Sequence, residues 1–129
     1  MKAFAFMPEF RPPSFSTPKS ERIYELRSYG SWTEEKATKK IHMFNEGGEM
    51  AVFEEVGSKA AFYGQVVIGS QRPRLMYMTT YENMESQKEH WAAFSKHPAW
   101  QAMRVKEEYA NTVIRALPYL LHPTDYSDF

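Results

Sequence analysis

The chain has no cysteine, and this absence removes several kinds of site at once. Disulfide frameworks, thiolate zinc sites, iron–sulfur clusters and cysteine nucleophiles are all excluded. Long apolar runs are also missing, since no stretch approaches the roughly 20 residues that cross a bilayer. The apolar start, Ala3 to Met7, ends at Pro8 and is too short for the core of a signal peptide. We therefore expect no membrane span, with the cytoplasm as the default compartment.

Neither sign of charge predominates, because 16 basic residues balance 16 acidic ones. Without a positive surplus, nothing in the composition attracts a phosphate backbone or an anionic lipid surface. Nucleic acid is therefore not an expected partner. A length of 129 residues with 43% hydrophobic content suits one domain that buries a core of its own.

Aromatic residues are abundant, with nine Phe, eight Tyr and three Trp. The first 20 residues contain four prolines among four phenylalanines, and these prolines exclude a helix or a central strand. We predict an extended arm over residues 1–20. Burying each phenylalanine contributes about 1.5–3 kcal/mol, so the arm is expected to pack on the domain or on a second subunit. A linker to an upstream domain is the alternative.

The next segment predicts a strand followed by a long helix. From residue 22 to residue 29 the side chains alternate with period two. Ser31-Trp-Thr-Glu34 has the spacing of a capping box, so a helix is expected from there to about Val56. Its apolar positions recur every three or four residues, apart from Gly47-Gly48. Two glycines inside a helix cost about 1 kcal/mol each relative to alanine, and close approach of another backbone is the expected reason.

Three further strands and a second helical region follow. Residues 60–69 and 75–80 alternate again around a short loop, which predicts an antiparallel hairpin. Asn83 is placed to cap the next helix, and Pro98 is placed at the first turn of a short helical segment. A last β-like run over residues 112–121 contains a proline, which favours an edge strand.

The resulting order is strand, helix, strand, strand, helix, strand, the split βαβ pattern of ferredoxin-like domains. The fold class is therefore α+β, with a four-stranded antiparallel sheet and both helices on one face. Every strand carries bulky apolar residues on both faces, so the second face must also be covered. We expect a homodimer that stacks two sheets into an α+β barrel. The alternative is a monomer that uses an exposed aromatic sheet as a binding platform, although large exposed apolar patches are uncommon.

Several segments carry a resemblance to a known family: Arg22-Ile-Tyr-Glu-Leu-Arg-Ser-Tyr29, Met43-Phe-Asn-Glu-Gly-Gly-Glu-Met50, Phe62-Tyr-Gly64, Leu75-Met-Tyr-Met-Thr79, His90-Trp-Ala-Ala-Phe94, His97-Pro-Ala-Trp100 and Pro123-Thr-Asp-Tyr-Ser-Asp-Phe129. Over about residues 21–129 the chain resembles NIPSNAP-type domains. The resemblance implies a dimeric α+β barrel, a group whose relatives include cofactor-independent monooxygenases, and no cofactor is expected. It supplies no catalytic motif. In similar bacterial members a comparable domain follows another one, so it also implies a short version or the C-terminal half of such a protein.

One candidate site lies on the long predicted helix, where His42, Glu46 and Glu49 stand at i, i+4 and i+7. On a continuous helix they share one face, which could bind a divalent metal or supply a general base. A metal would need a further ligand such as His90. A polar face that pairs with Lys or Arg is the simpler interpretation, so no metal is predicted and these residues remain weak candidates.

The second candidate site is a cleft between the sheet and the helices, which suits a small apolar or aromatic ligand. His90, beside a tryptophan, is the candidate acid or base. Aromatic residues in this pattern are often structural, so a packed core is the competing interpretation. The candidate ligand-binding residues are Tyr24, Arg27, Phe44, Asn45, Tyr63, Tyr77, Trp91 and Trp100.

Two functions therefore remain open at this point. The first is a dimeric small-molecule binding domain, extending to a cofactor-free monooxygenase or isomerase-like enzyme. The second is a non-catalytic module for protein interaction and assembly. A cavity of a few hundred Å³ with convergent polar groups favours the first, whereas a cleft filled by aromatic side chains favours the second.

Overall fold

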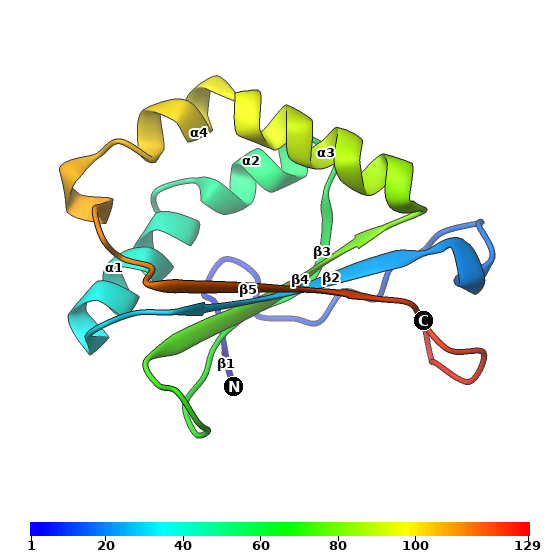
Figure 1. The fold of residues 1–129 in the computed structure, drawn as a ribbon, viewed down its shortest axis with the longest axis horizontal. Helices are drawn as coiled ribbons and strands as arrows, with labels where there is room; N and C mark the ends of the chain where they lie inside the picture. The colour runs from blue at the N-terminus through cyan, green and yellow to red at the C-terminus, as the bar shows by residue number, and fades with distance from the viewer.

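A five-stranded antiparallel sheet carries all of the α-helices on one face, in the order β1-β3-β4-β2-β5 (Figure 1). The structure is a computed structural model that describes residues 1–129. None of its helices combines the length and hydropathy that a bilayer crossing demands. The strands are β1 (Lys2–Ala3), β2 (Ile23–Gly30), β3 (Lys59–Gln65), β4 (Arg74–Tyr81) and β5 (Arg115–Leu121); the helices are α1 (Glu34–Phe44), α2 (Glu49–Glu55), α3 (Met84–Lys96) and α4 (Pro98–Met103), with short 3-10 turns at Lys19–Glu21 and Glu107–Tyr109.

The four longer strands have the order β3-β4-β2-β5, as the split βαβ pattern requires. The expected count of four strands is wrong by one, because Lys2 and Ala3 at the start of the arm pair with Gln65 and Gly64 of β3. The prolines of residues 1–20 predict no strand in the arm, but Lys2 and Ala3 precede the first proline and are therefore free to pair. The sheet therefore gains a short edge strand from the arm.

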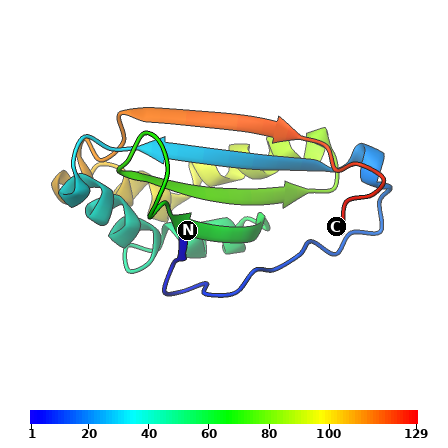
Figure 2. The ribbon, with the colours of Figure 1, turned by 90° about the horizontal axis from the view of Figure 1, so that it is seen from below.

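The arm packs against its own domain along the β3 edge (Figure 2). Phe4 and Met7 are almost fully buried, and the Phe4 N–H donates to the carbonyl of Tyr63 at 3.1 Å. Further along, the Arg11 N–H donates to the carbonyl of Ala61 at 2.9 Å. Because these bonds satisfy backbone groups of an edge strand, the arm covers an edge that would otherwise be open for pairing.

The single long helix expected over residues 34–56 is wrong, since the chain forms two helices instead. α1 ends at Phe44, and Gly48 takes the left-handed conformation with φ of 94° before α2 begins. A Cβ on Gly47 would lie 2.6 Å from the carbonyl oxygen of Met43 and 2.7 Å from the hydroxyl of Tyr109. The two glycines thus make a tight turn between helices, where one supplies positive φ and the other a close approach.

Capping residues set where the helices begin. Thr33 caps α1, because its hydroxyl accepts from the Lys36 N–H at 3.1 Å. The capping box expected from Ser31 is wrong, since the Ser31 hydroxyl donates to the carbonyl of Thr112 instead. The expected caps further along are confirmed, since Asn83 Oδ1 accepts from the Ser86 N–H at 2.8 Å and Pro98 begins α4.

The main core lies between the sheet and the helices and is dominated by packed aromatic rings. Phe53 stacks on Phe94 with ring centroids 4.3 Å apart, and Tyr63 stacks on Tyr77 at 5.5 Å. The opposite face of the sheet has a smaller cluster around Tyr24, which the C-terminal Phe129 contacts. Tyr24 and Met78 are buried on that face, whereas Tyr119 and Leu121 on its β5 side are 47% and 41% exposed.

Candidate functional site

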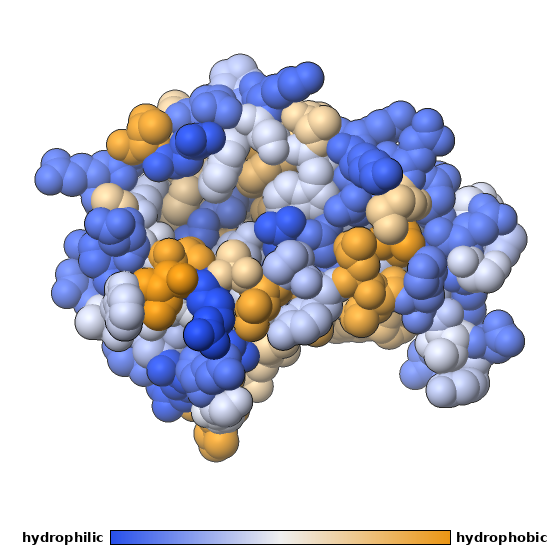
Figure 3. Space-filling view, in the orientation of Figure 1, coloured by the Kyte–Doolittle hydropathy of each residue, from blue (hydrophilic) through white to orange (hydrophobic).

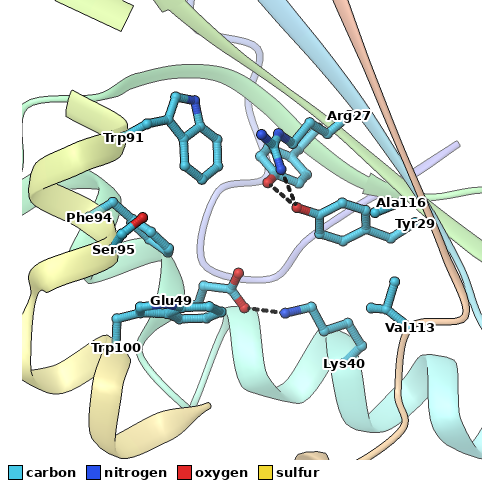
Figure 4. Close-up of a pocket in the computed structure, with 11 residues that line it drawn as sticks. Arg27, Tyr29, Lys40, Glu49, Trp91, Phe94, Ser95, Trp100, Val113 and Ala116 are labelled. Atoms are coloured by element: carbon cyan, nitrogen blue, oxygen red, sulfur yellow. Dashed lines mark hydrogen bonds and ion pairs between the residues drawn. The ribbon is translucent and has the colours of Figure 1, made fainter. Parts of the chain in front are cut away.

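A cavity of about 280 Å³ lies between the sheet and the helices and opens beside β5. Figure 3 shows this side of the molecule hollowed between the helical layer and the sheet, and Figure 4 shows the side chains that surround the hollow. Its walls come from β2, β4 and β5 below and from all four α-helices above and beside them. The lining residues are Arg27, Tyr29, Lys40, Glu49, Tyr77, Trp91, Phe94, Ser95, Trp100, Val113 and Ala116.

Arg27 places a guanidinium group in this cavity from the centre of β2. Its Nε donates to Glu25 Oε1 at 2.6 Å, and its Nη1 donates to the Tyr29 hydroxyl at 3.1 Å. The guanidinium carbon lies 3.9 Å from the centre of a Trp91 ring, in cation–π contact. Burial opposes the charge of Arg27, but the fields of Tyr29, Tyr77 and Glu25 raise its pKa overall. The cation is therefore fixed in position and remains charged.

Glu25, the ion-pair partner of Arg27, is almost fully buried. Its Oε2 accepts from Trp91 Nε1 at 2.5 Å and from Gln87 Nε2 at 2.9 Å, while Oε1 accepts from Arg27. A carboxylate with three donors is satisfied although it lies away from water. Glu25 thus orients both Arg27 and the indole that forms one wall of the cavity.

A pair of tyrosine hydroxyls lies beside Arg27. Tyr29 on β2 and Tyr77 on β4 have their oxygens 2.9 Å apart, which follows from the antiparallel register that places these strands side by side. Tyr77 is fully buried, and burial raises its pKa well above the ordinary value. Tyr77 therefore stays neutral and acts as a hydrogen-bond donor or acceptor.

The opposite wall contains a buried ion pair between α1 and α2. Lys40 Nζ donates to Glu49 Oε2 at 2.6 Å, and the two side chains are only 6% and 3% exposed. The ammonium also lies 4.8 Å from the centre of the Phe44 ring. Burial raises the pKa of Glu49, although Lys40 opposes this shift. A carboxyl group of raised pKa that faces a cavity is suited to accept and return a proton.

The cavity brings together four of the ligand-binding residues named from the sequence: Arg27, Tyr77, Trp91 and Trp100. Trp91 comes from α3 and Trp100 from α4. Phe94, between them in sequence, packs against both tryptophan rings with centroids 5.4 and 4.8 Å away. These rings form the aromatic part of the wall.

The other four named residues lie elsewhere. Phe44 and Tyr63 are closed in the core, with Phe44 fully buried. Asn45 faces the arm, since its Oδ1 accepts from the Phe6 N–H at 3.1 Å and its amide donates to the carbonyl of Ile41. Tyr24 lies on the face of the sheet opposite the helices.

His90 does not line the cavity, although its neighbour Trp91 does. Its ring lies 5.7 Å from that of Tyr81, and its Nε2 is 3.5 Å from where a Cβ on Gly57 would stand. Its Nδ1 is buried without a hydrogen-bond partner. Consecutive residues of a helix point about 100° apart, so Trp91 and His90 face different neighbours.

The three weak metal candidates are separated by the break between α1 and α2. His42 Nδ1 is 2.9 Å from the Tyr109 hydroxyl, Glu46 is exposed in the turn, and Glu49 points into the cavity toward Lys40. No group of three His, Asp or Glu side chains in the chain is arranged to hold a metal ion. Their spacing on a continuous helix does not survive the turn.

Sequence reasoning missed several residues of the site, chiefly Tyr29, Lys40 and Glu25. Tyr29 shares a face with Arg27 through the period-two alternation of β2, a signal present in the sequence. Lys40 lies three residues after Ala37 on the apolar side of α1, and both are buried. A lysine on an apolar helix stripe is the sequence signal of a buried cation with a partner.

Three other hollows have larger volumes: one of about 290 Å³ lies between the arm and α1 and holds no buried ion pair, and two have volumes of about 410 Å³ each. One lies near Arg72, Arg74 and Arg115 at the end of the hairpin, and the other lies between the arm and β3. Neither gathers buried ion pairs as the sheet–helix cavity does. We therefore take the sheet–helix cavity as the candidate site.

Fold and cavity together define an α+β domain with one helical layer and an aromatic cleft that contains internal ion pairs. The family model described as NIPSNAP matches residues 24–128, so the chain belongs to the NIPSNAP family. No curated protein matches the sequence.

Solved structures of similar fold come from the same family. A NIPSNAP-like domain protein from Burkholderia xenovorans, described as uncharacterized, has a TM-score of 0.73 and 21% identity, covering 84% of this chain and 90% of that chain. A NIPSNAP family protein of unknown function from Agrobacterium tumefaciens has a TM-score of 0.72 and 14% identity, covering 87% and 96%. A second protein from that organism has a TM-score of 0.70 and 20% identity, covering 83% and 97%. At these identities the likeness concerns the fold alone.

Proposed function

We propose that this NIPSNAP domain binds a small apolar or aromatic molecule in the sheet–helix cavity and works as a homodimer. The observation that carries the proposal is the hollow itself, which aromatic side chains leave open instead of filling. Its volume of about 280 Å³ is close to the lower end of ligand pockets, about 300–1,000 Å³. A compound of one or two fused rings matches this size.

The chemistry of the walls supports a flat ligand that carries a polar group. Trp91, Phe94 and Trp100 offer ring faces and edges for stacking. Arg27 and Tyr29 on the sheet side, and Glu49 on the helix side, direct polar atoms into the same space (Figure 4). A few convergent polar groups within an apolar lining fix the orientation of a bound molecule.

The exposed β5 side of the sheet face opposite the helices supports the homodimer. Leu26, Met78 and Tyr119 are directly paired neighbours across β2, β4 and β5, so they share the face opposite the helices. Met78 is already buried, but Tyr119 is 47% exposed and Leu121 is 41% exposed. A second copy stacked on this face would bury them in a symmetric interface.

Catalysis without a cofactor is the natural extension of this function. A cofactor-free monooxygenase-like or isomerase-like reaction begins by removing a proton from the substrate, and the cavity offers a carboxyl group beside fixed donors for that step. The alternative, a non-catalytic assembly module, is favoured by the same apolar sheet face. The open cavity supports ligand binding over assembly, because an assembly module gains nothing from it.

Ligand binding is tested by saturation-transfer difference NMR with β-tetralone, a fused-ring ketone, as the probe. Ala116→Trp should abolish the signal, because Ala116 lines the cavity and an indole there would fill it. Ala93→Trp is the matched control, since Ala93 is exposed on α3 and is not part of the lining. Absence of a signal from the wild type, or an equal signal from Ala116→Trp, would contradict the proposal.

A further inference from the structure

The hydroxyl hydrogen of Tyr29 is free to point into the cavity. Tyr77 is fully buried, and the Tyr29 oxygen is its one hydrogen-bond partner. If Tyr29 donated to Tyr77, the Tyr77 hydrogen would have no acceptor, which costs about 1–3 kcal/mol for a buried group. Tyr77 therefore donates and Tyr29 accepts, both from Tyr77 and from Arg27. The remaining hydrogen of Tyr29 is then available to a ligand.

Glu49 faces this donor from the helix side with one oxygen unused. Its Oε2 accepts from Lys40, whereas Oε1 has no partner within the chain and points into the cavity in Figure 4. Glu25, the other buried carboxylate nearby, is fully engaged, because three donors occupy its two oxygens. Arg27 stays cationic, so it cannot accept a proton. Glu49 is the one group in the cavity that combines a basic atom with a free approach.

We infer that Glu49 is a general base which removes a proton from the carbon next to the carbonyl group of a small cyclic or aryl ketone, with Tyr29 and Arg27 holding the carbonyl oxygen. This inference rests on the proposed binding function and gives its ligand class. The C–H bond breaks and its proton passes to Glu49 Oε1, while the electron pair forms a C=C bond and the carbonyl becomes an enolate. Return of the proton to the same or another carbon regenerates Glu49 and completes an exchange or an isomerisation. No oxidant or reductant is consumed.

The sheet side of the cavity holds the carbonyl oxygen, and the helix side supplies the base. The Tyr29 hydroxyl donates to the enolate oxygen, and the Arg27 cation beside it, fixed by Glu25, stabilises the developing negative charge. Lys40 holds Glu49 in place through Oε2 and leaves Oε1 toward the ligand. A ligand bound between the aromatic walls would displace water from them, so that the carboxylate and the donors would act in a medium of low polarity.

The inference is tested by following deuterium incorporation into β-tetralone in deuterium oxide by proton NMR, with binding measured in parallel. We expect the wild type to accelerate exchange next to the carbonyl group. Glu49→Gln should keep binding and lose about 10²–10⁴-fold in exchange rate, and Tyr29→Phe about 10²–10³-fold. Glu54→Gln is the matched control, because Glu54 lies on the same helix with its side chain 61% exposed.

The outcomes separate this inference from the function on which it rests. Binding without accelerated exchange, or exchange by Glu49→Gln at the wild-type rate, would overturn the general base and leave ligand binding standing. Tyr29→Phe leaves the Lys40–Glu49 pair intact, so it tests the same reaction independently if Glu49→Gln does not fold. Failure of the wild type to bind β-tetralone would overturn the proposed function itself.

Discussion

Replacing Lys40 by methionine tests whether the ion pair in the cavity wall is ionised. Methionine keeps an unbranched apolar side chain, so the main loss is the ammonium group that pairs with Glu49 at 2.6 Å. Glu49 would then be left as a buried carboxylate without a cation. Removing one partner of a buried pair costs about 3–5 kcal/mol when the remaining charge cannot be neutralised.

Protonation of Glu49 limits this cost and makes it depend on pH. Neutralising a carboxyl group of ordinary pKa about 4.3 costs about 1.4 kcal/mol per pH unit, hence about 3.7 kcal/mol at pH 7 and about 1 kcal/mol at pH 5. Burial already raises the pKa of Glu49 in the wild type, so part of the cost is present there. A raised folded-state pKa means that stability is highest below the unfolded-state pKa and falls as pH rises through the folded-state value. We expect Lys40→Met to destabilise by about 2–3 kcal/mol at pH 7 and by less than about 1 kcal/mol at pH 5.

Urea unfolding at both pH values measures this difference directly, because the midpoint and slope give the free energy of unfolding. Lys39→Met is the matched control: Lys39 forms an exposed pair with Glu35 on the same helix, worth about 0.3–0.5 kcal/mol. The double variant Lys40→Met/Glu49→Met should recover most of the loss, since apolar pairs replace buried ion pairs at little cost. Equal destabilisation by Lys40→Met at both pH values, or a loss no larger than that of Lys39→Met, would refute the reasoning.

Three further predictions concern the arm, the turn and the sheet face. Phe4→Ala should lower the free energy of unfolding, measured with urea, by about 3–5 kcal/mol. Phe6 is 60% exposed, so Phe6→Ala should lower it by less than about 0.5 kcal/mol. Similar losses for the two variants would mean that the arm does not pack as described. Gly47→Ala should lower the thermal midpoint, because its Cβ would lie 2.6 Å from a backbone oxygen, and an unchanged midpoint would contradict this. Light scattering should give a dimer for the wild type and a monomer for Tyr119→Lys, with Lys106→Ala, at an exposed position outside the sheet, as the control; a wild-type monomer at micromolar concentration would refute the homodimer.

Much of the fold could be predicted from local sequence patterns. The period-two alternation of β2 and β4 places one set of side chains toward the helices, and the observed register keeps directly paired residues on one face. Asn83 caps α3 and Pro98 begins α4. Both helix starts are predictable from sequence because a capping residue acts on neighbours only two or three residues away. Such features need no knowledge of the distant chain.

The features that sequence reasoning missed depend on distant contacts. Apolar spacing is interrupted at Gly47-Gly48 but resumes at Ala51 and Val52, so periodicity predicts one helix across the gap. Tyr109, far along the chain, fills the space where a side chain on Gly47 would stand and thereby fixes the turn. Likewise, β1 forms because Lys2 and Ala3 find a free edge on β3, which local propensity cannot reveal.

The candidate site shows the same division. Arg27, Tyr77, Trp91 and Trp100 are recognisable as a cavity lining because large side chains on the inner face of a strand or helix point to the same layer. Lys40 and Glu49 become partners only because the turn folds α2 back toward α1, which brings residues nine apart in sequence within 2.6 Å.

That pair also bears on the choice between an assembly module and a binding site. Buried ion pairs contribute little net stability compared with apolar side chains of similar size, because desolvation offsets their attraction. A domain whose cleft served only packing would be as stable with two apolar residues at Lys40 and Glu49. The cavity instead holds this pair opposite a second one, Arg27 with Glu25, and leaves Glu49 Oε1 without a partner in the chain. Charges that stability does not require, arranged around an open space, are expected where a ligand provides the remaining interactions.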